Sequence, residues 1–244
     1  MKKIALTLCI AVFLSACSGG VESPKTDVFY SPHPDDEVLS MGAAIIDSIE
    51  NNKEVVVVLL SHGRASKAIN KVNNKLLTEK QPPISELEFG NARVTEFKNS
   101  VRELGVKDSN IHILDLPDGN ILIGQMVDVI LDFEKKYEGD VNHHVMSDLD
   151  PHQDHAMTGK ALRELEKDGK INGGLYYLPV QEHNKMKFDK IIKIETKNNE
   201  KHFLKALEAY EKWEPASNNY SIGKISVPEY FEYAKEWKES RYHN

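Results

Sequence analysis

The segment that most constrains the fold is the run Glu54 to Leu60, which reads Glu-Val-Val-Val-Val-Leu-Leu. Successive residues of a β-strand point to opposite faces of the sheet, so a strand that is apolar at almost every position has both faces covered. Sheets of this kind are typically parallel and lie between two layers of helices. This run therefore predicts an α/β fold.

Strand and helix patterns alternate along the rest of the chain. Strands are expected at residues 27–31, 54–60, 111–114, 142–147, 174–178 and 191–195, the last as an edge strand. Helices are expected at residues 38–49, 86–104, 121–137, 154–167, 202–213 and 227–240. The polar stretch 65–83 lacks clear apolar periodicity, and we expect a mobile flap there. The alternation predicts a Rossmann-like three-layer sandwich with a mostly parallel sheet.

The first residues have the pattern of a secretion signal rather than of a core element. Met1-Lys2-Lys3 precedes the apolar run Ile4 to Leu14, which is too short to span a bilayer. Leu14-Ser15-Ala16-Cys17 then resembles the lipobox of bacterial lipoproteins, which implies acylation of Cys17; the alternative is an ordinary signal peptide with an incidental cysteine. We expect a lipoprotein signal peptide at 1–16, a lipidated tether at 17–25 and a single domain at 26–244, anchored to a membrane outside the cytoplasm.

Composition argues against cysteine ligands for a metal and against a nucleic-acid partner. The two cysteines, Cys9 and Cys17, leave the mature domain without an internal disulfide, so a transition metal would be held by histidines and carboxylates. The formal net charge is −7, and removal of Lys2 and Lys3 with the leader makes the remaining chain more acidic. This acidity argues against a nucleic-acid partner, because such binding depends on basic groups that neutralise phosphates.

Two clusters that mix imidazoles and carboxylates carry the chemistry. The cluster His33-Pro34-Asp35-Asp36-Glu37 follows the first expected strand, and His152-Gln153-Asp154-His155 follows the fourth. In an open parallel sheet the ligand crevice lies beyond the carboxyl ends of the strands, so both clusters can meet at one edge. Catalytic zinc sites use three protein ligands and keep one open position. The pattern predicts a metallohydrolase, although carboxylates at a helix start are also common as caps.

The segment 31–39, Ser-Pro-His-Pro-Asp-Asp-Glu-Val-Leu, resembles the first motif of the PIG-L (LmbE-like) deacetylases. The cluster 152–155 resembles the second motif, and Arg93, Glu96 and the turn Leu116-Pro117-Asp118-Gly119 match further family positions. The resemblance extends from about residue 27 to about residue 180. Pro32, the segment 41–44 and Gln153 depart from the family pattern, which leaves the substrate open.

The resemblance implies a role for each of six residues. His33, Asp36 and His155 would bind zinc, although a site with a carboxylate also accepts other divalent ions. Asp35 would be the general base, His152 would assist at the carbonyl oxygen, and Asp154 would orient His152. The expected reaction is hydrolysis of the N-acetyl group of an amino sugar or glycoconjugate to acetate and a free amine.

Other residues have weaker assignments. Arg64, beside His62 and Gly63, and Arg93 are candidates for substrate binding, and Asp118 is either a substrate contact or a turn-former. We expect Glu37 to serve the positive end of a helix, and His143 and His144 to be structural. The aromatic residues of the C-terminal region stack on sugar rings or belong to the core, namely Trp213, Tyr220, Tyr230, Phe231, Tyr233 and Trp237.

Two other functions compete with a membrane-tethered deacetylase. The first is a lipoprotein that binds sugars or a metal without catalysis, and Asp35 argues against it because a pure binder needs no unligated carboxylate beside an ion. The second is a nucleotide-binding domain. It is disfavoured because no Gly-x-Gly-x-x-Gly follows the first strand.

Overall fold

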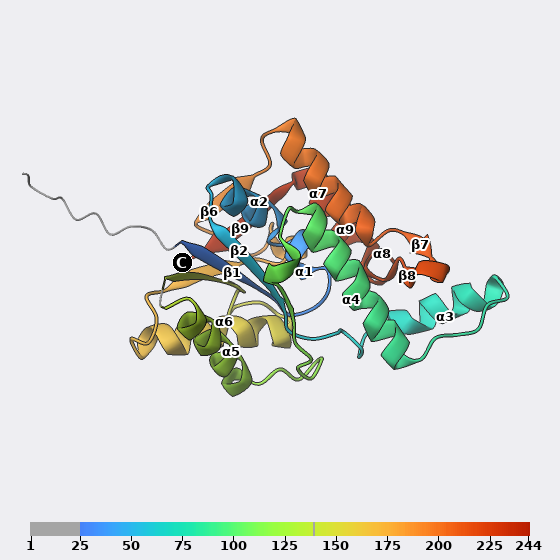
Figure 1. The fold of residues 1–244 in the computed structure, drawn as a ribbon, viewed down its shortest axis with the longest axis horizontal. Helices are drawn as coiled ribbons and strands as arrows, with labels where there is room; N and C mark the ends of the chain where they lie inside the picture. Colours follow the sequence, from blue (N-terminus) through green and yellow to red (C-terminus); the bar gives the residue numbers. More distant parts are fainter. Residues whose placement is uncertain (1–24, 139) are drawn as a thin grey trace, which may run out of the picture.

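The computed structural model describes residues 25–138 and 140–244; the predicted signal peptide, Cys17 and residues 18–24 of the predicted tether lie outside these ranges. The described residues contain a sheet in the order β3-β2-β1-β4-β5-β9-β6 (Figure 1). Five neighbouring strands are parallel: β3 (Ile111–Ile113), β2 (Glu54–Leu59), β1 (Thr26–Ser31), β4 (Val141–Met146) and β5 (Gly174–Tyr177). β9 (Glu239–His243) and β6 (Lys190–Lys193) extend the sheet antiparallel. The predicted α/β fold is confirmed.

Helices cover both faces of the sheet (Figure 1). One face packs against α2 (Gly42–Glu50), α4 (Glu86–Glu103), α7 (Lys197–Ala209) and α9 (Pro228–Trp237), and the other against α5 (Ile123–Lys136) and α6 (Gln153–Lys167). Beside α4, a smaller unit contains α3 (Ala68–Thr78), α8 (Ile222–Ser226) and the hairpin of β7 (Trp213–Glu214) and β8 (Asn219–Tyr220). Among the described helices, none is both long and apolar enough to cross a bilayer.

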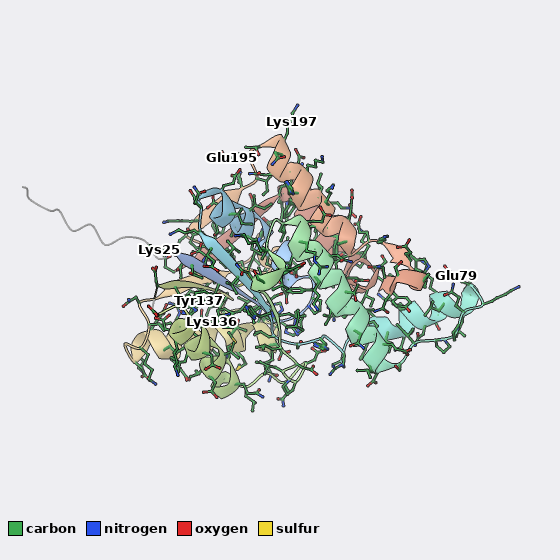
Figure 2. All side chains as sticks on the ribbon, viewed as in Figure 1. Lys25, Glu79, Lys136, Tyr137, Glu195 and Lys197 are labelled. Carbon is green, nitrogen blue, oxygen red and sulfur yellow. The ribbon has the colours of Figure 1, made fainter. Side chains whose placement is uncertain are left out.

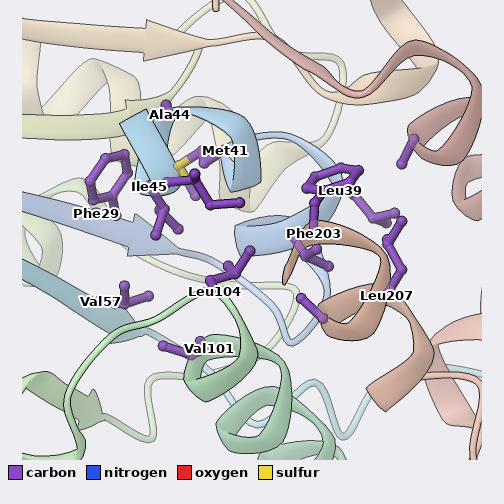
Figure 3. Packing of buried hydrophobic residues seen from close by; sticks show 14 of the residues in the cluster. Phe29, Leu39, Met41, Ala44, Ile45, Val57, Val101, Leu104, Phe203 and Leu207 are labelled. Atoms are coloured by element: carbon purple, nitrogen blue, oxygen red, sulfur yellow. The ribbon is translucent and has the colours of Figure 1, made fainter. Parts of the chain in front are cut away.

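The side chains of β2 alternate between the two halves of the core, as its apolar run predicts. Val55, Val57 and Leu59 belong to the cluster under α2, α4 and α7, whereas Val56 and Val58 belong to the cluster under α5 and α6. Figure 3 shows the first cluster, in which Val57 and Phe29 of the sheet face Ile45 of α2. Because its side chains are buried in both clusters, β2 holds helices on both faces of the sheet. Fully burying one such side chain stabilises the fold by roughly 1.5–3 kcal/mol.

The single helix expected at 38–49 is divided into α1 (Asp36–Leu39) and α2. Met41 occupies the N-cap position of α2 without a capping hydrogen bond from its side chain, and the ring of Phe203 from α7 lies against Gly42, where an added Cβ would be 2.8 Å from that ring. The break separates a short turn that carries Asp36 and Glu37 from the helix that packs on the sheet. Helical spacing in sequence could not reveal it, because the packing partner lies in α7.

The stretch 65–83 contains the helix α3, which its lack of clear apolar periodicity did not indicate; its mobility as a flap stays a prediction. In α3, Ala68, Val72 and Leu76 are buried at a spacing of four residues. They pack with residues of α4, β8 and α8, and thus with a partner that is more than a hundred residues away in sequence. Figure 2 shows Glu79, which directly follows α3, on the other side of the molecule from Lys25, which directly precedes β1.

The C-terminal region differs most from the sequence expectation. The helix expected at 227–240 ends at Trp237, Lys238 adopts a left-handed conformation with φ 50°, and the chain continues as β9. The helix expected at 202–213 begins earlier, because the Thr196 side chain accepts a hydrogen bond from the backbone N–H of Asn199. The predicted edge strand is confirmed, since β6 closes one end of the sheet.

Gly159 of α6 sets the distance between this helix and the loop after β4. A Cβ at this position would lie 2.3 Å from the backbone nitrogen of Asp148. We predict that Gly159→Ala lowers the free energy of unfolding by roughly 1–3 kcal/mol, as overpacking does, measured by chemical denaturation. Gly124→Ala on α5 is the matched control, because nothing lies within 4 Å of its added Cβ. Equal stability of the two variants would refute this account of the α6 packing.

His183 makes the stability of the fold sensitive to acid. Its ring is 1% exposed, stacks on Trp237 and lies 4.0 Å from Glu239, and neither ring nitrogen has a hydrogen-bond partner among the described residues. Burial, with the nearby charge of Arg241, lowers the pKa of His183 to about 4.

The unfolded chain therefore binds a proton at His183 more readily than the folded protein does. The stabilising contribution of the neutral ring is complete above pH 6.5 and is lost as the pH falls towards 4. In His183→Leu, we expect the loss of unfolding free energy between pH 7 and 4 to be smaller by up to about 3 kcal/mol than in the wild type, in parallel urea titrations. An identical acid dependence in both proteins would contradict this prediction.

Candidate active site

Parallel strand pairing brings the two sequence clusters together. β1 and β4 are neighbours, with Phe29 opposite His144, so the loops that follow them leave the same edge of the sheet. The first loop carries His33 into α1, and the second leads to α6, which begins at Gln153. The expectation that the two loops share one edge is confirmed.

Three ligand atoms from these loops converge. His33 Nδ1 lies 3.3 Å from Asp36 Oδ2 and 3.3 Å from His155 Nε2, and these last two atoms are 3.1 Å apart. Four ligands at about 2.1 Å around a tetrahedral ion are separated by about 3.4 Å, so this nearly equilateral triangle fits three ligands of one divalent cation with a fourth position open. All three side chains are buried.

The other nitrogen of each imidazole faces carboxylates. His33 Nε2 lies 3.0 Å from Asp154 Oδ2 and 3.2 Å from Asp118 Oδ1, and His155 Nδ1 lies 2.9 Å from Asp150 Oδ2. Histidines that bind metals commonly donate their second N–H to a carboxylate, which fixes the tautomer and the ring orientation. Asp150 was missed in the sequence. Its place five residues before His155, in the same loop, was the available signal.

The cluster favours a positive charge at its centre. Burial alone lowers the pKa of His155, but the charge of Asp36 and the hydrogen bond with Asp150 raise it to about 9. Burial likewise opposes the charged form of His33, yet its contacts with Asp118, Asp154 and Asp36 raise its pKa well above the usual value. A proton or a metal cation satisfies the same excess of negative charge.

Asp154 contacts His33 rather than the histidine that it was expected to orient. Burial raises the pKa of Asp154, but hydrogen bonds from His33, from Ile121 N at 3.1 Å and from Gly119 N at 2.7 Å lower it to about 2. His152 is exposed at the mouth of the site, with its ring centroid 4.5 Å from that of His155. His152 also forms an alternative ligand group with His33 and His155.

Asp35 lies beside the triangle in a strained conformation. Its φ is 116°, a region that L-residues rarely adopt, and such strain persists only where surrounding contacts impose it. The Asp35 N–H donates to Glu37 Oε2 at 3.0 Å, and Arg93 Nη2 approaches Asp35 Oδ2 at 3.4 Å. Burial raises the pKa of Asp35 to about 7, against the opposing charge of Arg93.

Arg93 and Glu37 both hold the loop that carries Asp35. Arg93 is buried and donates to Pro34 O at 2.7 Å and to Gly63 O at 2.9 Å, while it lines the site cavity. Gly63, with φ 67°, admits this guanidinium, since a Cβ there would lie 2.1 Å from Nη1. Glu37 is fully buried, and its Oε1 accepts a hydrogen bond from Tyr210 OH at 2.8 Å. Glu37 lies in the first turn of α1 and accepts a hydrogen bond from the N–H of Asp35, the residue before that helix, which agrees with the expected role at a helix start; the contact with Tyr210 is additional.

The remaining predicted residues have different surroundings. Arg64 donates to Asp115 Oδ2 at 3.0 Å and pairs with His62, outside the cavity that contains the triangle. Asp118 lies between the surroundings of Arg64 and the cavity that contains the triangle. Its Oδ2 accepts a hydrogen bond from Ala65 N at 2.6 Å, and its Oδ1 faces His33. The roles of Arg64, Arg93 and Asp118 in substrate binding stay predictions.

His143 and His144 are structural, as expected. His143 Nδ1 lies 3.0 Å from Tyr30 OH, and His144 Nδ1 lies 2.9 Å from Tyr177 OH. Both rings are buried in the sheet layer.

The site cavity has a volume of about 370 Å³ and includes residues of the C-terminal region, namely Gln181, Ser226, Val227 and Tyr230. Of the six aromatic residues considered from the sequence, Tyr230 alone lines it within the described ranges. Tyr233 and Trp237 stack on each other, and Phe231 is in the core. Glu96, which the sequence resemblance singled out, accepts hydrogen bonds from the N–H groups of Tyr220, Ile222 and Gly223 and so holds this region in place.

The contact between Tyr210 and Glu37 gives a testable prediction. Tyr210→Phe removes one hydrogen-bond partner of the Glu37 carboxyl group, which has no access to water, so we expect a loss of roughly 1–3 kcal/mol in unfolding free energy. Tyr233→Phe, at a partly exposed ring, is the control and should change stability little. Calorimetry of both variants tests this, and an equal effect in the two would exclude a special role for the buried hydroxyl.

The model of the family PIG-L: GlcNAc-PI de-N-acetylase matches residues 28–166, more than half of the chain. Curated protein sequences gave no match.

Solved structures share the fold. A triple mutant of a deacetylase of the teicoplanin biosynthetic pathway has a TM-score of 0.61 at 16% identity, covering 89% of this chain and 98% of its own. The N,N'-diacetylchitobiose deacetylase of Pyrococcus horikoshii has 0.57 at 20% identity, with 90% and 83% covered. The 4-carboxy-2-hydroxymuconate hydratase of Pseudomonas putida has 0.58 at 16% identity, with 89% and 95% covered. The hydratase indicates that the fold alone does not fix the reaction.

Proposed function

The chain belongs to the PIG-L: GlcNAc-PI de-N-acetylase family, and on this basis we propose that it is a metal-dependent hydrolase that removes the N-acetyl group from an amino sugar or glycoconjugate. The observation that carries the proposal is the triangle of His33 Nδ1, Asp36 Oδ2 and His155 Nε2 with an additional carboxylate, Asp35, beside it. Three ligands, one open position and an unligated base are the parts that hydrolysis of an amide requires.

His33, Asp36 and His155 would hold the metal, which we propose to be zinc or another divalent ion. When bound, such an ion supplies Lewis-acid polarisation of a carbonyl oxygen and makes water more acidic. Asp150 and Asp154 keep the imidazoles in the orientation that points their ligand atoms at one position.

Asp35 would take the proton of the attacking water and later deliver it to the departing amine. The contacts of its backbone with Glu37 and of its carboxylate with Arg93 fix the direction of this base before substrate arrives. His152, exposed at the mouth of the cavity, would donate a hydrogen bond to the oxygen of the tetrahedral intermediate. The products are acetate and a free amine.

We also propose that the protein is an extracytoplasmic lipoprotein anchored through Cys17, on the basis of its leader sequence. Lys25 directly precedes β1 and so lies at the amino edge of the sheet (Figure 2). The crevice is lined by His33 and His155, which follow the carboxyl ends of β1 and β4. An anchor that enters from the amino edge favours a substrate in the envelope or outside it over one embedded in the anchoring membrane.

The decisive test is Asp35→Asn, which keeps the shape of the side chain but removes its ability to accept a proton. We expect acetate release from N-acetylated sugars to fall by about 10²–10⁴-fold while the bound metal, measured by elemental analysis, is retained. Asp128→Asn on the exposed surface of α5 is the matched control and should keep full activity.

Two outcomes would count against the proposal. Undiminished turnover in Asp35→Asn would reject the assignment of the base. Tight binding of metal or sugar by the wild type, without acetate release from any N-acetylated sugar before or after treatment with a chelator and metal, would favour the non-catalytic lipoprotein.

A further inference from the structure

A second cavity adjoins the one that contains the triangle. Its volume is about 650 Å³, against about 370 Å³ for the inner cavity, and Ala65, Ser66 and Asp118 line both. The two cavities therefore form one crevice with an inner lobe at the triangle and an outer lobe beside α3. The inner lobe is near the lower end of the ~300–1,000 Å³ typical of small-molecule sites, so a ligand that reaches the triangle has more space on its outer side.

Asp118 fixes the boundary between the lobes. Its Oδ1 lies 3.2 Å from His33 Nε2 in the inner lobe, and its Oδ2 accepts a hydrogen bond from Ala65 N at 2.6 Å. One carboxylate thus contacts a candidate metal ligand and the loop that forms the outer lobe. A ligand that spans both lobes would pass this group.

The charges of the outer lobe largely cancel one another. Arg64 pairs with Asp115 at 3.0 Å and also contacts His62, while Lys67 and Glu86 add one charge of each sign. Paired cations with carboxylates beside them do not suit a polyanion such as a phosphate polymer. The lobe therefore fits a neutral ligand.

The remaining lining matches a ligand that is rich in hydroxyl groups. The exposed amide of Asn70 can both donate and accept hydrogen bonds. Ile69 and Leu116 are partly exposed in the same lobe and offer apolar surface to the C–H faces of a ring.

We propose that the outer lobe is a subsite for further sugar units of a neutral N-acetylated oligosaccharide, so that the inner lobe receives one N-acetylhexosamine of a chain rather than a free monosaccharide. This inference rests on the proposed deacetylase function and names its substrate class. α3, which the sequence did not predict, supplies Ile69 and Asn70 and thus sets the preference for chains.

The test compares β-1,4-linked N-acetylglucosamine oligomers of one to four units as substrates of the full-length protein in detergent. The readout is the ratio of kcat/KM for the trimer to kcat/KM for the monomer. We expect this ratio to be at least about tenfold in the wild type, which corresponds to about 1.4 kcal/mol of extra transition-state binding. Asn70→Trp fills the outer lobe and should bring the ratio close to one.

Asn74→Trp is the matched control, because Asn74 is exposed on the same helix but lines neither lobe. It should keep the wild-type ratio. A wild-type ratio near one, a ratio that survives Asn70→Trp, or an equal loss in Asn74→Trp would each overturn the subsite while leaving the deacetylase function intact.

A binding experiment separates failure of the subsite from failure of the function. Calorimetric titration of Asp35→Asn protein should give at least about tenfold tighter binding of the trimer than of the monomer, and adding Asn70→Trp should abolish the difference. If no oligomer is hydrolysed but this difference is found, the deacetylase proposal fails and the subsite stands. If the oligomers are hydrolysed but no difference is found, the subsite fails alone.

Discussion

The parallel pairing of β1 with β4 is the constraint on which the site depends. It places the ends of two strands, whose following loops are more than a hundred residues apart in sequence, side by side at one edge. His33 and Asp36 then need only the short turn of α1, and His155 only the first turn of α6, to bring three ligand atoms within 3.3 Å of one another. A slip of one residue between these strands would point their side chains to the wrong faces, so the site depends on the register of β1 against β4 as well as on their adjacency.

The electrostatic character of the site follows from an excess of buried acidic groups over buried basic ones, and burial raises the pKa of Asp35 to about 7 and that of Glu37 to about 8. Asp35, Asp36, Glu37, Asp150 and Asp154 are all buried around it, whereas Arg93 is the single buried Lys or Arg side chain in the described ranges. Backbone N–H groups and Tyr210 satisfy part of this excess. The remaining acidic groups are balanced by the imidazole rings of His33 and His155 and by any cation that these rings face, because unpaired carboxylates are costly away from water.

The C-terminal region lies beyond the segment that the family model matches, but it contributes residues to the site. Tyr210 of α7 reaches Glu37, and Glu96 of α4 anchors the turn at Tyr220 to Gly223 through backbone N–H groups. Tyr230 and Gln181 line the inner lobe. The proposed metal ligands and base thus come from the first two-thirds of the chain, while the crevice is also lined by residues beyond the segment that the family model matches.

The sequence by itself determined the fold class and the two clusters at the centre of the site. A run such as Val55 to Leu60 can be buried only between two layers, and local spacing placed His33 and Asp36 on one turn and His155 on the next cluster. Tertiary structure decided the rest, because it depends on contacts between distant segments. Asp154 faces His33 instead of His152, Glu37 contacts Tyr210, and the buried face of α3 packs on residues of α4, β8 and α8. Periodicity reports which side of an element is apolar, but not which distant partner covers it, and partner choice fixed these contacts.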